Sequence, residues 1–277
     1  MTTLSLTGLY VYRDVVRLGY PVLESFLSTV DMVDQCVICI DPTSDSESIN
    51  LVNALASKFP QKVRIVEFTW PIGATGDGSV IGIASNFALA QCRTSHFVNV
   101  QADELWSPIL MQETRDHWRE AVGKGIDCLR FHVLSLEHNM QNEQHGAGYT
   151  HSVKLARVCP AIRFEPDAWS LSGCTMLANV AISESSPIVH CHDHFRDHLI
   201  DIRFNAANAL WTDREKFGHY LQSAETIKST KDEWFNDPLW TNRESRYSYL
   251  LPDFAKWIIG RTSYSIRWEL LNGWNKT

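Results

Sequence analysis

The feature that most constrains the fold is a regular alternation of short apolar segments and amphipathic segments over the first hundred residues. Strand patterns occur at 4–11, 35–40, 63–68 and 97–100, and helical spacing of apolar residues occurs between them at 20–30, 47–59 and 80–92. Parallel strands need a crossover of about a dozen residues, which is usually a helix, and that crossover is right-handed. The alternation therefore predicts an α/β fold, with a mainly parallel, Rossmann-like sheet flanked by helices.

The rhythm changes after residue 104. A helix is expected at 108–122, followed by strand patterns at 128–136, 153–158, 161–164 and 188–191, and then by helical, aromatic-rich sequence from 197. This change predicts a mixed second half of the sheet. We expect one domain over residues 1–196, with a helical C-terminal extension over 197–277 packed on it.

Composition and charge exclude several classes of protein. The chain has 277 residues, of which 44% are hydrophobic and 21% charged, as in proteins with a well-formed core. Its net charge of −7 disfavours nucleic acid as the main partner, because phosphate backbones select basic surfaces. No apolar run approaches the roughly 20 residues of a membrane span, and the first residues do not follow the pattern of a signal peptide.

The seven cysteines are scattered along the chain. Cys36 and Cys39 form a C-x-x-C inside a strand pattern, where side chains three residues apart point to opposite faces. A zinc site would need a second such pair, and the sequence has none. We therefore expect all seven to be reduced, mostly buried thiols, and expect a cytoplasmic protein.

Carboxylates stand at the carboxyl ends of two predicted strands. Asp41 follows the strand at 35–40, and Asp103 and Glu104 follow the strand at 97–100. Such ends share one edge of a parallel sheet, where α/β proteins bind ligands. One carboxylate can accept hydrogen bonds from a base or ribose, and another can hold a hard cation that neutralises a diphosphate leaving group. The alternative is that Asp41 and Asp103 simply cap the helices that follow them.

Three segments carry a family resemblance. They are VICIDPTSD at 37–45, SNFALA at 85–90 and NVQADE at 99–104. In this order and spacing they resemble the nucleotide-binding half of a GT-A glycosyltransferase, closest to the family 2 type. The resemblance implies a transferase that uses a nucleotide-sugar donor, expected to be a UDP-sugar, together with Mn²⁺ or Mg²⁺.

The resemblance also implies roles for individual residues. Asp41 would contact the nucleotide and Asp103 the metal. Tyr10, Tyr12 and Arg13, at the end of the first strand, would line the nucleotide pocket.

Two further positions are matched only in part. Asn86 corresponds to the Asn of a family Arg-Asn pair, but Ser85 replaces the Arg. Gln101 replaces the first Asp of the DxD element and is expected to bond to ribose or phosphate. The replacement also raises a second possibility, a degenerate nucleotide-sugar-binding protein without turnover.

A histidine-rich segment, PIVHCHDHFR, occupies residues 187–196. On a strand His190 and His192 face the same way, so both can reach one ion. The segment resembles the family element in which a histidine completes the metal site, which implies His190 and His192 as ligands beside Asp103. Two alternatives remain: a polar, solvated strand end, and a metal-dependent hydrolase built on His190, His192 and His194.

An inverting transferase also needs a carboxylate that removes the acceptor hydroxyl proton. Residues 157–170 resemble the acceptor side of the family, and they offer Glu165 and Asp167. We expect Asp167 to be this base. An ordinary loop aspartate after a proline is the alternative, and a retaining enzyme would need no such base. The acceptor itself is left open as a glycan, a lipid-linked molecule, a protein or a small molecule.

Overall fold

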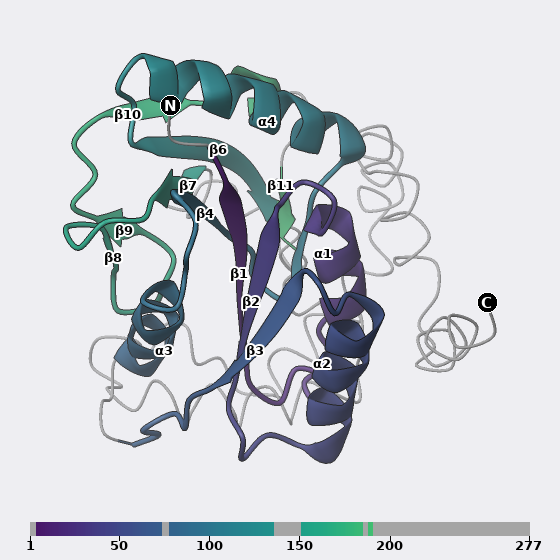
Figure 1. Cartoon of the computed structure of the whole chain (residues 1–277). Helices are drawn as coiled ribbons and strands as arrows, with labels where there is room; N and C mark the ends of the chain where they lie inside the picture. The colour runs from purple at the N-terminus through teal and green to yellow at the C-terminus, as the bar shows by residue number, and fades with distance from the viewer. Residues whose placement is uncertain (1–3, 74–77, 136–150, 185–187, 191–277) are drawn as a thin grey trace, which may run out of the picture.

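The computed structural model describes residues 4–73, 78–135, 151–184 and 188–190 (Figure 1). The predicted domain boundary after residue 196, the predicted helical extension at 197–277 and His192 lie outside the described residues. Among the described helices, none combines the length and the hydropathy needed to cross a bilayer.

The described residues form a large mixed sheet with strand order β3-β2-β1-β4-β7-β6-β11-β5, and β10 pairs with β6 beside this path. Its strands are β1 (Leu6–Tyr12), β2 (Gln35–Ile40), β3 (Val63–Glu67), β4 (His96–Asn99), β5 (Glu104–Leu105), β6 (Cys128–Ser135), β7 (His151–Arg157), β10 (Leu177–Asn179) and β11 (Ile188–His190). A separate antiparallel pair joins β8 (Arg163–Phe164) to β9 (Leu171–Ser172).

The first four strands of this sheet are all parallel to one another. They are connected by α1 (Val22–Thr29), α2 (Ser46–Lys58) and α3 (Ser79–Leu89), as the alternating sequence pattern predicts. Strand β7 then runs antiparallel to β4 and β6, and β5 runs antiparallel to β11. The predicted α/β class, with a mainly parallel sheet and a mixed second half, is confirmed. Strands β5, β9 and β10 have two or three residues each, which is too short for a periodic pattern to reveal.

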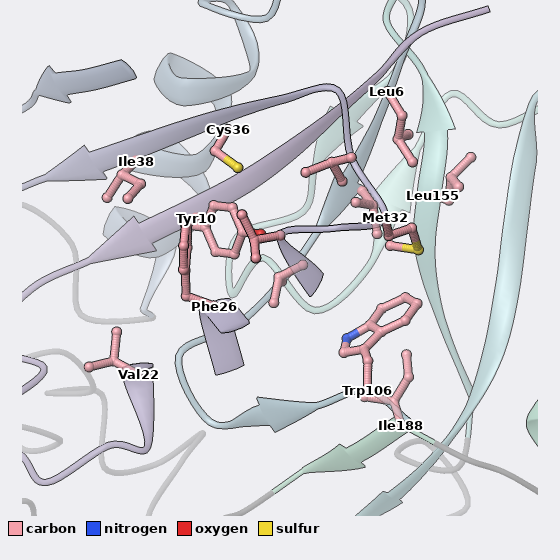
Figure 2. Close-up of a cluster of buried hydrophobic side chains, with 14 of the residues drawn as sticks. Leu6, Tyr10, Val22, Phe26, Met32, Cys36, Ile38, Trp106, Leu155 and Ile188 are labelled. Carbon is pink, nitrogen blue, oxygen red and sulfur yellow. The ribbon is translucent and has the colours of Figure 1, made fainter. Parts of the chain in front are cut away.

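Helices cover both faces of the sheet, and Figure 1 shows α1 and α2 on one side with α3 on the other. Alternate residues of β1 and β2 divide between two apolar clusters: Tyr10 and Ile38 belong to the larger, and Leu9 and Val37 to the smaller. The larger cluster packs beneath α1, α2 and α4 (Pro108–Gly123), and Trp106 is one of its fully buried members (Figure 2). Buried faces on both sides explain why these strands are almost continuously apolar in sequence.

The cysteine prediction needs a correction. Cys128, at the start of β6, forms a disulfide with Cys174, so these two are not thiols. The strand pairing of β6 with β10 brings the two segments together, which sequence spacing could not reveal. Since disulfides are typical of oxidising compartments, the cysteines no longer support a cytoplasmic location.

The C-x-x-C prediction is confirmed, because Cys36 and Cys39 lie in different apolar clusters on opposite faces of β2. Burial raises the pKa of the Cys36, Cys39 and Cys92 thiols to about 12 each. They are therefore unreactive thiols near neutral pH. Cys159 is also a free thiol, and Cys191 lies outside the described residues.

Candidate functional site

Two clusters of charged side chains lie at the edge where the parallel strands end. We call them the Asp41 cluster and the Asp103 cluster. Residues that follow β1, β2 and β3 form the Asp41 cluster: Arg13, Asp14, Asp41, Thr43 and Trp70. The Asp103 cluster joins the turn after β4 to β7, β11 and the segment after β8: Asp103, Glu104, Lys154, Trp169 and His190.

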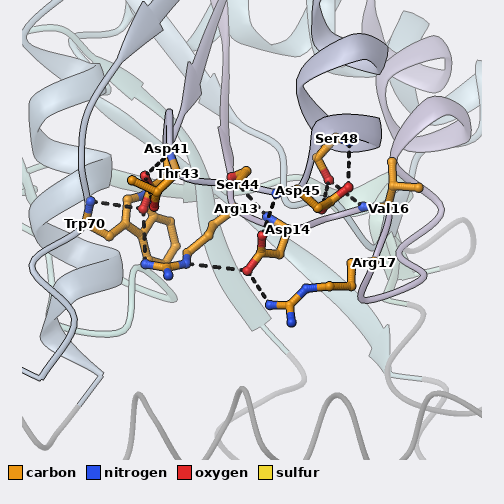
Figure 3. Close-up of polar contacts among 10 residues, drawn as sticks. All are labelled: Arg13, Asp14, Val16, Arg17, Asp41, Thr43, Ser44, Asp45, Ser48 and Trp70. Atoms are coloured by element: carbon orange, nitrogen blue, oxygen red, sulfur yellow. Dashed lines mark hydrogen bonds and ion pairs between the residues drawn. The ribbon is translucent and has the colours of Figure 1, made fainter.

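Asp41 is fully buried, and both of its carboxylate oxygens are engaged (Figure 3). Oδ1 accepts hydrogen bonds from the backbone N–H and the hydroxyl of Thr43, at 2.8 and 2.7 Å. Oδ2 accepts from Nη1 of Arg13 at 3.0 Å and from the backbone N–H of Trp70 at 3.1 Å. Asp41 therefore ties the ends of three neighbouring strands together.

Arg13 is the half-buried cation of the Asp41 cluster. About a quarter of its side chain (26%) reaches solvent, and its guanidinium lies 5.9 Å from the centroid of the Trp70 ring. On its other side, Nε of Arg13 lies 3.7 Å from Asp14, which in turn pairs with Arg17 (Figure 3). The cluster thus presents a fixed guanidinium beside an indole, which suits stacking and hydrogen bonding to a nucleobase or sugar.

Asp14 completes this network through the backbone. It is buried, has a left-handed backbone with φ of 51°, and accepts the backbone N–H of Asp45 at 2.9 Å. Asp45, not Asp41, caps helix α2 by accepting from the backbone N–H of Ser48. The alternative in which Asp41 is a helix cap is therefore wrong.

The corresponding alternative for Asp103 is also wrong, because Ser107 caps helix α4. Instead, Oδ2 of Asp103 lies 3.4 Å from Nε2 of His190. Strand β11 places His190 directly opposite Glu104 of β5. Asp103 and His190, which are far apart in sequence, are thus neighbours at one sheet edge, and both are largely buried.

Glu104 faces Lys154, and both side chains are fully buried. Lys154 Nζ lies 2.5 Å from Oε1 of Glu104, although the angles are not those of a regular hydrogen bond. Lys154 Nζ also lies 4.7 Å from the centroid of the Trp169 ring, which makes a T-shaped contact with the His190 ring at 5.8 Å between centroids. Charge and aromatic contacts therefore link all five members of the cluster.

The two tyrosines are placed differently from the prediction. Tyr10 and Tyr12 are fully buried, and the Tyr10 hydroxyl bonds to Oγ1 of Thr29 in the larger apolar cluster. Burial raises the pKa of both phenols well above 10. Their rings form the core beneath the sheet edge and do not line an exposed pocket. Tyr10 and Tyr12 are two residues apart on β1, so both side chains point to the same buried face of the sheet. Arg13 is the first residue beyond the end of this strand.

Asn86 also has a placement that the family resemblance does not suggest. Its side-chain amide donates to the carbonyl of Phe164 at 3.1 Å and accepts the Phe164 N–H at 2.9 Å. One turn earlier, the Gly82 N–H bonds to the carbonyl of Pro166, and a Cβ at Gly82 would lie 2.4 Å from the carbonyl oxygen of Glu165. Helix α3 therefore anchors the segment that leads to Trp169.

Gln101 and Asp167 both lie in turns beside the Asp103 cluster. The Gln101 backbone N–H donates to Oε2 of Glu104, and its carbonyl accepts from the Ser25 hydroxyl. Asp167 is exposed, and its Oδ1 accepts the Trp169 backbone N–H at 3.0 Å. The roles expected for these two side chains, toward phosphate or ribose and as a base, stay predictions.

The sequence patterns did not identify four residues of these clusters: Asp14, Trp70, Lys154 and Trp169. Lys154 did carry a signal, because it stands between Val153 and Leu155 within an apolar strand pattern. A charge inside such a strand indicates a buried partner. Trp70 and Trp169 carried none, because their contacts depend on how the loops return to the sheet edge.

Comparisons with known proteins give only distant likenesses. No protein-family model and no curated protein matches the sequence. Among solved structures, S. aureus TarS 1-349 in complex with UDP-GlcNAc is 10% identical, with 89% of this chain and 73% of that chain covered and a TM-score of 0.47. The mannosyltransferase PcManGT from Pyrobaculum calidifontis, in complex with GDP-Man and Mn²⁺, is 13% identical, with 99% and 88% covered and a TM-score of 0.42. Both TM-scores lie below 0.5, so any conclusion about function has to come from the chain's own residues.

Proposed function

We propose that this chain is a glycosyltransferase that moves a sugar from a nucleotide-diphosphate donor, expected to be a UDP-sugar, to an acceptor hydroxyl. The observation that carries the proposal is the meeting of Asp103 and His190 at the carboxyl edge of the sheet. The sequence resemblance had assigned metal binding to both residues, and their contact supports that assignment. The acceptor stays open.

The residues fit a divalent cation. A carboxylate oxygen and an imidazole nitrogen 3.4 Å apart form a donor set suited to Mn²⁺, and two protein ligands suffice when phosphate oxygens supply others. Glu104 is not a further ligand here, because Lys154 holds it. Among the residues that the structure describes, no third histidine, cysteine or acid joins the pair to make a larger group.

A bound cation would supply charge neutralisation for the diphosphate as the glycosidic bond breaks. Asp103 and His190 would hold that cation, and Arg13 with Trp70 would bind the nucleoside part of the donor. Asp41 would act indirectly, by fixing Arg13, since its own oxygens are fully engaged. Asp167 is the proposed base, because it is exposed and lies two residues from Trp169 at the edge of the Asp103 cluster.

Thermal unfolding with UDP, in the presence of Mn²⁺ or EDTA, tests this proposal. We expect UDP with Mn²⁺ to raise Tm by about 5 °C at saturation, and EDTA to remove the effect. His190→Ala should lose the shift, whereas the control His117→Ala on helix α4 should keep it. The proposal fails if neither UDP nor GDP stabilises the chain in a metal-dependent way.

Gln101 favours a second candidate, a nucleotide-sugar binder without turnover, because it stands where the family element has its first aspartate. Slow hydrolysis of a UDP-sugar separates the two, since a glycosyltransferase commonly hydrolyses its donor when acceptor is absent. Metal-dependent UDP binding without any hydrolysis would support the binder. Stabilisation by Mn²⁺ alone, lost in His190→Ala and insensitive to nucleotide, would instead support the metal-dependent hydrolase.

A further inference from the structure

We propose that Lys154 is a positioning residue for the Asp103–His190 pair. It would act through a closed ring of contacts that runs from Glu104 to Lys154, Trp169, His190 and Asp103. Each link is a direct contact, and the chain itself closes the ring where Asp103 precedes Glu104. This inference rests on the proposed function, since it concerns how the proposed metal ligands are held.

The first half of the ring orients Asp103. Glu104 uses Oε1 for Lys154 and Oε2 for the backbone N–H of Gln101, at 2.5 and 3.2 Å. Its own backbone N–H donates to the Gln101 carbonyl at 3.2 Å. These bonds close a tight turn over residues 101–104, and Asp103 lies inside it. Lys154 therefore holds the Glu104 carboxylate, and that carboxylate holds the turn around Asp103.

The second half of the ring orients His190. The Lys154 ammonium lies over the Trp169 ring, which suits a cation–π contact in a desolvated site, and that ring makes a T-shaped contact with the His190 imidazole. The backbone of Trp169 is held independently, because its carbonyl accepts the Ser152 hydroxyl at 2.8 Å and its N–H bonds to Asp167. Trp169 is thus a fixed wall between Lys154 and His190.

Stability alone is a poor reason for this ion pair. Burying two charges carries a large desolvation cost, and apolar pairs of similar volume are often as stable or more so. Lys154 and Glu104 are both fully buried, yet they meet without the angles of a regular hydrogen bond. Each is also linked to one proposed metal ligand, Glu104 to its chain neighbour Asp103 and Lys154 to His190 through Trp169. A positioning role accounts for this placement of the pair.

Mn²⁺ titration followed by electron paramagnetic resonance, with UDP as the probe nucleotide, tests the inference. We expect Lys154→Met to weaken Mn²⁺ binding by about 10- to 100-fold, as for other residues that orient metal ligands. Because Glu104 would then be buried without its partner, the double variant Lys154→Met with Glu104→Gln is also needed. It should recover stability but not Mn²⁺ affinity. Lys154→Arg, which keeps the charge and stacks on indole, should recover much of the affinity.

Asp127→Asn is the matched control. Asp127 is also buried, but it lies at the amino edge of β6, where it accepts hydrogen bonds from Thr175 and Met176. It should lose stability and keep Mn²⁺ affinity. Equal losses of affinity in Asp127→Asn and Lys154→Met, or wild-type affinity in the double variant, would overturn the inference. If the wild-type chain binds no Mn²⁺ with UDP, the proposed function itself fails, and that result is distinct from either outcome.

Discussion

Asp41 and Asp103 occupy equivalent places in the sheet, each just beyond the carboxyl end of a parallel strand, yet their surroundings differ. Asp41 accepts four hydrogen bonds from three chain segments and is fully buried. Asp103 keeps a small exposed fraction (9%) and lies beside an imidazole that can itself bind a metal. The two aspartates therefore share a position at a strand end and differ in the side chains and backbone groups that contact them.

In each cluster, different side chains hold the backbone and face the proposed ligand. In the Asp41 cluster, the carboxylate holds the backbone and the arginine reaches outward. In the Asp103 cluster, a second carboxylate, Glu104, takes the structural bonds. Asp103 faces His190. If this division holds, substitution of Asp103 should reduce binding more than stability, and substitution of Asp41 should reduce stability more than Mn²⁺ binding.

Asp103→Ala should give the largest effect on binding. Loss of a direct ligand should abolish detectable Mn²⁺-dependent UDP binding, a greater loss than the roughly 10- to 100-fold caused by removing a supporting contact. Unfolding in urea should change by only about 1 kcal/mol, because bonds made by Glu104 close the turn that holds Asp103. Isothermal titration with UDP and Mn²⁺, beside a urea titration of the same sample, measures both. Retained binding would show that Asp103 is not the ligand.

Asp41→Asn should show the reverse signature. The loss of charge opposite Arg13 and the weakening of four hydrogen bonds should lower the free energy of unfolding by about 3–4 kcal/mol. Mn²⁺ affinity should stay within about threefold of wild type in protein that remains folded. Urea unfolding and Mn²⁺ titration on the same variant test this. A variant with normal stability that fails to bind UDP would instead make Asp41 a direct nucleotide ligand.

The disulfide offers a perturbation that touches neither cluster. Cys128 and Cys174 are 46 residues apart in sequence, and the bond lies at the start of β6, away from the carboxyl edge. Reduction should lower the free energy of unfolding by about 3 kcal/mol, mainly by freeing the unfolded chain. Urea titrations with and without dithiothreitol measure the loss, and Cys174→Ser should match the reduced protein. UDP binding should not change, and a parallel loss of binding would mean that the two edges are coupled.

The periodic spacing of apolar residues in the sequence was enough to predict where Asp41 and Asp103 lie in the sheet. Apolar patterns located β1 to β4 and their helices, so the placement of Asp41 and Asp103 at one edge followed from parallel topology. The sequence could not predict that Asp45 and Ser107 would be the caps, because several polar residues compete at each helix start. Nor could it pair Lys154 with Glu104, since that contact depends on how β7 and β5 enter the sheet.

His96 provides a smaller test on the scaffold of the Asp103 cluster. It opens β4, packs against Trp118, and burial together with nearby Arg157 lowers its pKa from 6.5 to about 4. Between those values the unfolded chain binds the proton and the folded chain does not, so stability falls as the pH drops from 6.5 toward 4.

The expected loss attributable to His96 is about 2 kcal/mol between pH 7.5 and pH 5. Urea unfolding at these two pH values, with His96→Leu as the reference, isolates this share from that of the other histidines. Because β2, which leads to Asp41, and β4, which begins with His96, belong to one sheet, we expect this loss to lower the free energy of unfolding of the fold that carries both clusters. An unchanged pH dependence in His96→Leu would show that His96 is not the group responsible.

The smallest effect is expected from Gln101→Asp, which restores the aspartate of the family element. Its backbone already closes the turn, through bonds to Glu104 and Ser25, so the substitution changes the side chain and leaves the turn in place. An added carboxylate should raise Mn²⁺ affinity by about 3- to 10-fold, because charge count tunes the affinity of oxygen-rich sites. Repulsion by Asp103 and Glu104 limits the gain. Mn²⁺ titration with UDP measures it, and Gln101→Asn is the uncharged control. A gain in Gln101→Asp alone would locate the metal beside this turn, whereas equal affinity in both variants would place it out of reach of residue 101.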